Sequence, residues 1–257
     1  MVMSVLAGGL GNQMFQVAAG WALAKENNDE FAVDIRDHRC VNQGREAATY
    51  IDNIFSKINT SSFDVDSMVR YSERSFAYNQ IPYQPSTMID GYFQSEKYFI
   101  KYRDAILDLF NIRDLIPNII KDKYEPILEL ENTTSIHIRR GDYLTIQHIH
   151  PVCTMQYYHS CVDILPEDAN LLIFTDDIGW CADNFKSDRY HIVHEEDYID
   201  LYLMSQCTNN IIANSSFSWW GAWLNRHEEK RVFAPQRWFA TDYNNTVDLI
   251  PDDWQVI

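Results

Sequence analysis

The chain has 257 residues, 46% of them hydrophobic, 14% aromatic and 23% charged, a globular composition with enough length for one large core or two modest ones. The chain has 37 acidic and 21 basic residues, and the resulting net charge of −16 argues against nucleic acid or an anionic membrane face as the main partner. Five cysteines without a C-x-x-C pair indicate free buried thiols in a reducing compartment. No signal peptide and no bilayer-spanning apolar run are visible, so we expect a cytoplasmic protein.

The chain begins with the pattern of a βαβ unit. An apolar strand over residues 2–7 precedes the turn Gly8-Gly9-Leu10-Gly11-Asn12-Gln13, a helix, and a second strand over residues 31–35. The glycine spacing matches neither the dinucleotide fingerprint nor the end of a P-loop. Two interpretations stay open: a loop that carries the amides of Asn12 and Gln13 into a cleft, or a tight turn with Asn12 as the helix N-cap.

The middle of the chain is harder to interpret. Residues 36–94 mix polar residues with short apolar runs, and prolines interrupt any long element. Helical periodicity returns over residues 96–110 and 117–130. We therefore predict an N-terminal α/β domain over residues 1–130 and a C-terminal domain over residues 131–257.

From residue 134 onward short apolar strands alternate with helices. Strands are predicted over residues 134–139, 171–175, 190–193, 210–213 and 231–234, and helices over residues 155–165, 178–185, 198–207 and 217–225. This alternation is typical of a doubly wound parallel sheet, in which ligands bind at the carboxyl edge.

Polar side chains concentrate where these strands end. Four strand ends each deliver one group: Arg139, Arg140, Gly141 and Asp142; Thr175, Asp176 and Asp177; His194, Glu195 and Glu196; and Asn214, Ser215, Ser216 and Ser218. All of them therefore fall at the one edge where this architecture places a ligand.

The segment His137-Ile138-Arg139-Arg140-Gly141-Asp142-Tyr143 combines cations, a glycine and a carboxylate. An arginine fork fits phosphate oxygens two at a time, and a glycine lets the backbone approach a ligand closely. Asp142 can orient an arginine, hold a substrate hydroxyl or accept its proton. The alternative is a structural ion pair at a strand end.

The segment from Asn214 to Ser218 opens a helix whose free N–H groups favour phosphate, although serine and asparagine also serve as ordinary caps. With Arg139 arriving from the neighbouring loop, we interpret the pair as a diphosphate clamp. Asp176 and Asp177 fit nucleoside recognition better than metal binding, because adjacent residues on an extended segment point opposite ways; Asp177 as a helix N-cap stays open.

Two further patterns favour structural roles. The stripe Trp219-Trp220-Gly221-Ala222-Trp223 indicates a core helix rather than a sugar platform. His148, His150 and His159 lack the spacing of zinc ligands, so no metal is expected.

These motifs resemble the bacterial α-1,2-fucosyltransferases, which are inverting, metal-independent enzymes that use GDP-L-fucose. The likeness lies in four segments: residues 8–16, residues 137–143, Phe174-Thr175-Asp176-Asp177 with Trp180-Cys181, and residues 200–204 continuing through 211–223.

The resemblance implies a GT-B-like fold of two facing Rossmann-like domains, the C-terminal one binding the nucleotide sugar, and a place in surface polysaccharide synthesis. It places Arg139 at the donor diphosphate, His137 and Asp177 near the guanosine, and Ser215, Ser216 or Ser218 near the phosphates. We count Arg140, Asp176 and Asn214 with this donor site. Gly9, Asn12 and Gln13 are expected on the acceptor side, and no cofactor is implied.

The resemblance implies direct displacement at the anomeric carbon, with Arg139 and the helix N-terminus stabilising the leaving diphosphate. Asp142 is the first candidate for the general base, with His148 and His150 as alternatives. The middle region contains Tyr71, Tyr78, Tyr83, Tyr92 and Tyr98, whose aromatic faces and hydroxyls suit an uncharged sugar. The resemblance adds a terminal galactose as the acceptor, an α-1,2 bond and a loose association with membranes that carry lipid-linked acceptors. Two rival functions are a non-catalytic GDP- or glycan-binding module and a metal-dependent transferase using Asp176-Asp177.

Overall fold

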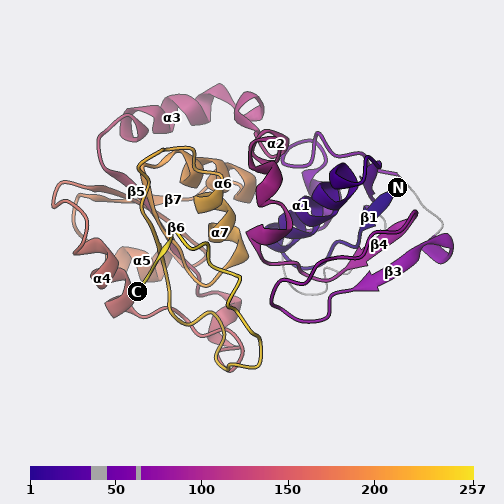
Figure 1. The fold of residues 1–257 in the computed structure, drawn as a ribbon. Helices are drawn as coiled ribbons and strands as arrows, with labels where there is room; N and C mark the ends of the chain where they lie inside the picture. The colour runs from indigo at the N-terminus through magenta and orange to yellow at the C-terminus, as the bar shows by residue number, and fades with distance from the viewer. Residues whose placement is uncertain (36–44, 62–64) are drawn as a thin grey trace. The chain divides into compact units, whose positions relative to one another are not determined.

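The computed structural model describes residues 1–35, 45–61 and 65–257 and divides them into two compact units. Unit 1 comprises Met1–Ile112 and Asn244–Pro251, and unit 2 comprises Arg113–Tyr243 and Asp252–Ile257 (Figure 1). The boundary predicted after residue 130 falls inside unit 2, and the segment Asn244–Pro251 groups with unit 1 although it lies near the end of the chain.

Unit 1 contains a four-stranded parallel sheet in the order β2-β1-β4-β3. Helix α1 (Leu10–Glu26) packs on this sheet with a buried face of small and apolar residues. A Cβ on Gly20 would lie 2.2 Å from Ser4 Oγ and 2.5 Å from the Phe31 ring, so a glycine is required where α1 crosses the strands. The strands are β1 (Val2–Ser4), β2 (Phe31–Val33), β3 (Val69–Ser72) and β4 (Thr87–Asp90).

The helix predicted over residues 96–110 is correct only in its second half. Two 3₁₀ turns, Glu96–Tyr98 and Ile100–Tyr102, precede α2 (Arg103–Leu109). Phe99 interrupts the helix with φ −141° and ψ −1°, and its fully buried ring packs 6.1 Å from that of Phe15. Packing of this ring into the core outweighs helical continuity.

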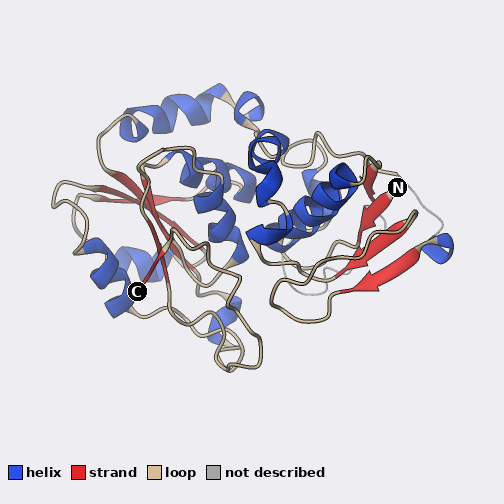
Figure 2. Ribbon diagram, viewed as in Figure 1, coloured by secondary structure: helices blue, strands red, loops and turns tan. Residues whose placement is uncertain are grey.

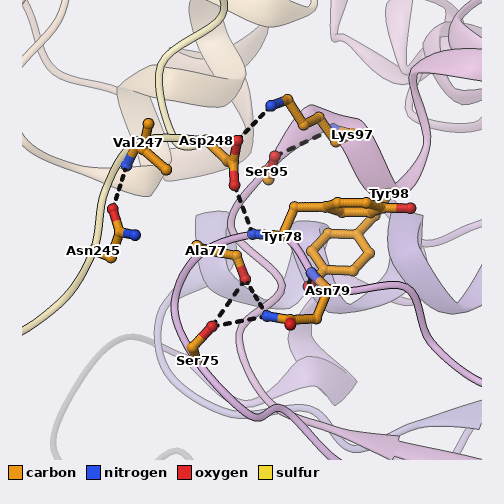
Figure 3. A network of polar contacts seen from close by, with 10 residues as sticks. All are labelled: Ser75, Ala77, Tyr78, Asn79, Ser95, Lys97, Tyr98, Asn245, Val247 and Asp248. Atoms are coloured by element: carbon orange, nitrogen blue, oxygen red, sulfur yellow. Dashed lines mark hydrogen bonds and ion pairs between the residues drawn. The ribbon is translucent and has the colours of Figure 1, made fainter.

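The segment Asn244–Pro251 is held on unit 1 by Asp248 (Figure 3). The Asp248 carboxylate accepts a 2.9 Å hydrogen bond from the backbone N–H of Tyr78 and forms an ion pair with Lys97. Leu249 beside it is buried. A short stretch from the end of the sequence is thus part of the N-terminal unit, an arrangement that the sequence pattern did not predict.

Unit 2 contains a six-stranded parallel sheet in the order β10-β9-β8-β5-β6-β7, which confirms the predicted α/β class with parallel strands. From β5 the chain moves outward through β6 and β7, then returns to place β8 on the other side of β5. The strand order therefore reverses between β5 and β8, the point at which open α/β sheets bind ligands. The strands are β5 (Thr133–Ile138), β6 (Asn170–Thr175), β7 (Tyr190–Val193), β8 (Asn209–Ile211), β9 (Val232–Ala234) and β10 (Gln255–Val256).

Helices cover both faces of this sheet (Figure 2). On one face, Ile136 and Ile173 join a core cluster with Tyr158 and Cys181. On the other, Asn210 Nδ2 donates to Ser135 Oγ at 2.7 Å and to the Met204 carbonyl at 2.8 Å, joining β8 to β5 and α6. The helices are α3 (Asn118–Leu128), α4 (Met155–Val162), α5 (Ile178–Asn184), α6 (Asp197–Gln206) and α7 (Ser216–Trp223).

The predictions for the tryptophans and cysteines agree with the structure. Trp219, Trp220 and Trp223 are fully buried, which confirms that their stripe belongs to the core. Four cysteines are free thiols, three of them buried; Cys40 lies outside the described residues. In the described part of the chain, no helix combines the length and apolar character needed to cross a membrane.

Candidate functional site

The candidate site of unit 2 lies at the carboxyl ends of β5 and β8. The hydroxyl of Tyr143, in the loop after β5, donates a 3.1 Å hydrogen bond to the backbone carbonyl of Asn214, in the loop after β8. Tyr143 is 8% exposed, so this bond is shielded from water. The two loops that flank the strand-order reversal are therefore held together.

Arg139 is positioned by two carboxylates and an aromatic ring. Its Nη2 lies 2.7 Å from Asp142 Oδ1, its Nη1 lies 2.9 Å from Asp176 Oδ2, and its guanidinium lies 5.3 Å from the Tyr143 ring centroid. The side chain is 33% exposed. A fork oriented in this way, with part of its surface open, can bind a phosphate with little further loss of rotamer freedom.

Arg140 has a different environment. Its Nε donates to Asp177 Oδ2 at 2.9 Å, and its guanidinium stacks 4.0 Å from the Trp180 ring centroid. Asp177 also accepts the N–H of Trp180 at 3.1 Å, which confirms its role as N-cap of α5. Bonds from Arg140 and this N–H lower the pKa of Asp177. Arg140 and Asp177 thus brace each other, whichever ligand binds nearby.

Asp176 joins the loops after β5 and β6. Its Oδ1 accepts the backbone N–H groups of Arg140 at 2.8 Å and Gly141 at 3.2 Å. A Cβ on Gly141 would lie 2.7 Å from Asp176 Oδ2, so the glycine allows this close approach. Across the described residues, no group of three or more His, Cys, Asp or Glu side chains is arranged to hold a metal ion.

The N-terminus of α7 presents Ser215 and Ser216, which are half-buried. Ser215 is the N-cap, and its Oγ accepts the N–H of Phe217 at 3.3 Å. The predicted capping is therefore present, and the first turn of the helix faces the same edge as Arg139. N–H groups at such a terminus favour anionic ligands.

Asn214 and Ser218 are each only 1% exposed. Asn214 Nδ2 donates to the carbonyls of Pro151 at 2.9 Å and Trp238 at 3.0 Å. The Ser218 hydroxyl lies 3.4 Å from the carbonyl of Ala213 and 3.3 Å from that of Ser215. Both side chains therefore support the loop through bonds to backbone carbonyls, and their expected contact with the donor stays a prediction.

His137 is 6% exposed and packs 5.5 Å from the ring of Phe217. Burial, aided by the charge of Arg139, lowers the pKa of His137 to about 3, so the imidazole is neutral. Its Nδ1 finds no hydrogen-bond partner within the described parts of the chain. A neutral ring nitrogen can form a hydrogen bond with a ligand, and the expected contact of His137 with guanosine stays a prediction.

The two alternative bases differ in their surroundings. His148 is exposed, whereas the His150 ring stacks on Tyr143 at 4.8 Å and 17° and lies 5.2 Å from Phe239. Burial lowers the pKa of His150, opposed by the negative charge of Asp142. His150 and Asp142 therefore lie in the same part of the site.

The glycine-rich loop of unit 1 differs from prediction in two respects. Gly9, not Asn12, is the N-cap of α1, and Asn12 Oδ1 instead accepts Gln94 Nε2 at 2.7 Å. Gln13 is fully buried, with its amide donated to the carbonyls of Gly8 and Arg45, both at 2.9 Å. Gln13 therefore supports the loop rather than presenting itself to an acceptor; Gly9 and Asn12 keep partial exposure.

The tyrosines expected to receive a sugar divide into two groups. Tyr78 and Tyr92 are 38% and 42% exposed, respectively. Tyr71 and Tyr98 pack against the buried cluster around Phe93, and the hydroxyl of Tyr83 donates to Asp29 at 3.0 Å. The physical basis for a neutral-sugar site thus rests on two residues of the five.

Asp200, in the first turn of α6, is a half-buried acid to which the sequence pattern assigned no role. Its Oδ1 is buried and lacks a hydrogen-bond partner among the described residues. Burial, with the charges of Glu195, Asp197 and Glu196, raises the pKa of Asp200 to about 8. In the sequence, the position of this acid between the apolar residues Ile199 and Leu201 was the one sign that it is partly buried.

Comparison with known proteins agrees with this picture. The chain is 34% identical to the Escherichia coli O-antigen biosynthesis glycosyltransferase WbnK and 31% identical to an E. coli alpha-1,2-colitosyltransferase, covering 98% of itself in both and 98% and 97% of those proteins. The solved structure of fucosyltransferase NodZ from Bradyrhizobium shares the fold, with a TM-score of 0.52 and 15% identity over 86% of this chain and 91% of that one. The family model of Glycosyl transferase family 11 matches residues 1–257, and the chain therefore belongs to that family, which confirms the resemblance found in its motifs.

Proposed function

We propose that this protein transfers L-fucose from GDP-β-L-fucose to the 2-hydroxyl of a terminal galactose in a neutral glycan, with inversion and without a metal ion. Membership of a glycosyltransferase family supports the reaction class. The similarity to an alpha-1,2-colitosyltransferase supports the linkage and makes a related deoxy sugar the main alternative donor.

The observation that carries this proposal is the arrangement around Arg139. The guanidinium is held between Asp142 and Asp176, and the N-terminus of α7 lies across the strand-order reversal. A nucleoside diphosphate carries its charge on two linked phosphates, which matches one arginine fork and one helix N-terminus.

We assign the base of the nucleotide to Asp200. A guanine presents two neighbouring donors, N1–H and the 2-amino group, and a carboxylate is the natural acceptor for such a pair. The buried Oδ1 of Asp200 has the acceptor capacity this requires. Hydrogen bonds from guanine favour the charged carboxylate, so we expect binding near pH 7 to release a proton.

In this account the acceptor hydroxyl attacks the anomeric carbon as GDP leaves, and negative charge develops on the leaving diphosphate. Arg139 and the N–H groups of α7 stabilise that charge as preorganised groups. Asp142 is the first candidate for the base that takes the hydroxyl proton, and His150 is the second. We also propose that the two units form the GT-B-like arrangement implied by the family, with the acceptor bound by unit 1.

The proposal is tested by incubating the protein with GDP-fucose and a panel of neutral and sialylated acceptors, with and without EDTA. A fucose attached to the 2-hydroxyl of galactose, formed equally well with EDTA, is the expected product. GDP binding without any product would instead support a non-catalytic module, and activity abolished by EDTA would support a metal-dependent transferase.

A further inference from the structure

Glu195, the second residue after β7, connects α3 to the loop that precedes α6. Its Oε1 lies 2.8 Å from the Tyr124 hydroxyl and 2.5 Å from Lys123 Nζ, both on α3. The Lys123 ammonium also lies 4.8 Å from the Tyr124 ring centroid. Tyr124 is the buried residue of α3, and the Glu195 side chain is 16% exposed. We call these three residues the α3 anchor.

The backbone of Glu195 performs a second task. Its N–H donates to the carboxyl of Asp200, one turn into α6. The side chain of one residue is therefore held by α3, while its main chain bonds to the acid that the proposed function assigns to the base.

The charges around the loop explain why an anchor is useful. Glu195, Glu196 and Asp197 are three consecutive acids that repel one another and Asp200. Burial opposes the charge of Glu195, but the bonds from Lys123 and Tyr124 outweigh it and lower the pKa of Glu195. The Glu195 carboxylate is thus engaged by α3, while its backbone N–H bonds to Asp200.

We propose that the α3 anchor positions the Asp200 carboxyl for the guanine base, so that Tyr124 and Glu195 are positioning residues that set the selectivity for guanine nucleotides. This inference rests on the proposed function, because it takes a guanine nucleotide as the ligand. It predicts that a contact between two side chains distant from the diphosphate controls recognition of the base.

The test compares the affinities of GDP and inosine diphosphate, which lacks the 2-amino group, by isothermal titration calorimetry. The unchanged protein should prefer GDP about ten-fold, the effect of one hydrogen bond to a charged group. Tyr124→Phe, which keeps the ring and loses the hydroxyl, should weaken GDP about five-fold. Inosine diphosphate keeps N1–H but lacks the 2-amino group, so its affinity should fall by less and the preference for GDP should shrink. Glu195→Gln should show the same loss of preference.

Asp122→Asn is the matched control, since Asp122 is an exposed acid on the same helix and should leave both affinities unchanged. A GDP preference in Tyr124→Phe and Glu195→Gln equal to that of the unchanged protein overturns the inference while leaving the proposed function intact. Equal weakening of both nucleotides would show a merely structural role and also overturn it. If the unchanged protein binds no GDP, the proposed function fails, and the inference fails with it.

Discussion

The hydroxyl of Tyr143 and the backbone carbonyl of Asn214 form a buried 3.1 Å hydrogen bond that joins the loops after β5 and β8. The loop after β5 holds Arg139 and the loop after β8 leads into α7. Tyr143 also contributes its ring to the surroundings of the Arg139 guanidinium. One tyrosine thus sets the spacing between the two groups proposed to bind the diphosphate.

Tyr143→Phe keeps the ring and removes this hydrogen bond. Because the Asn214 carbonyl would lose a buried partner, the free energy of unfolding should fall by about 1–3 kcal/mol. GDP affinity should fall several-fold as the two loops separate. Chemical denaturation and calorimetry measure the two quantities; unchanged GDP affinity would show that the bond serves stability alone.

Arg139→Lys keeps the charge and removes the fork. Lysine cannot reproduce two parallel hydrogen bonds, so we expect severe loss of turnover and a marked loss of GDP affinity. Arg140→Lys is the comparison, since Arg140 is engaged by Asp177 and Trp180 and should act mainly through stability. Turnover near that of the unchanged protein in Arg139→Lys would remove Arg139 from the donor site.

Asp142→Asn separates two roles of one carboxylate. If Asp142 is the general base, turnover should fall on the order of 10²–10⁴-fold while GDP affinity stays within a few-fold. Because Asp142 also pairs with Arg139 at 2.7 Å, equal losses of binding and turnover would instead assign it to bracing the arginine. Should His150→Phe, which keeps an aromatic ring in the stack, lose turnover while Asp142→Asn retains it, the base is His150.

Much of unit 2 could be predicted from the sequence because short strands rich in apolar and β-branched residues alternate with helices. All six residues of β5 are buried, and the polar residues follow directly, so both the strand and the candidate site were recognisable. In contrast, β3 is largely exposed and has no apolar alternation, and β10 has only two residues. Neither carries a periodic signal.

The roles of individual polar residues were less predictable. Asn214 and Ser218 have the composition of a phosphate-binding turn, yet both are buried against backbone carbonyls distant in sequence, such as that of Trp238. Gln13 is similar, with its amide bound to the carbonyl of Arg45. Such pairings depend on how the loops fold. The sequence therefore predicts that polar residues gather at this edge, but not which of them touch a ligand and which hold a loop in place.

Asp200→Asn should stabilise the empty protein and weaken nucleotide binding. Burial and the neighbouring acids Glu195, Glu196 and Asp197 raise the folded-state pKa of Asp200 to about 8, from an ordinary value of 3.8. Between these values the folded state binds more protons than the unfolded state, so the group reduces stability as pH rises from about 4 to 8. At pH 8 the asparagine variant should gain on the order of 5 kcal/mol in the free energy of unfolding, because each pKa unit between the two states is worth about 1.4 kcal/mol.

This gain should fall to a small remainder near pH 4, where the acid is protonated in the folded state and only about half ionised in the unfolded state. Denaturation at pH 4 and pH 8, together with GDP titrations at pH 7, gives the complete test. A stability gain that does not depend on pH would mean that Asp200 does not titrate in this range, and undiminished GDP affinity would remove it from the base-binding site.

The most direct measurement is the structure of the product formed from GDP-fucose and a neutral galactose-terminated oligosaccharide, determined by NMR. We expect a single fucose in α-linkage on the 2-hydroxyl of the terminal galactose, formed by the unchanged protein and lost in Arg139→Lys. Fucose on another hydroxyl, a strict requirement for a sialylated acceptor, or GDP-colitose accepted where GDP-fucose is refused would contradict it.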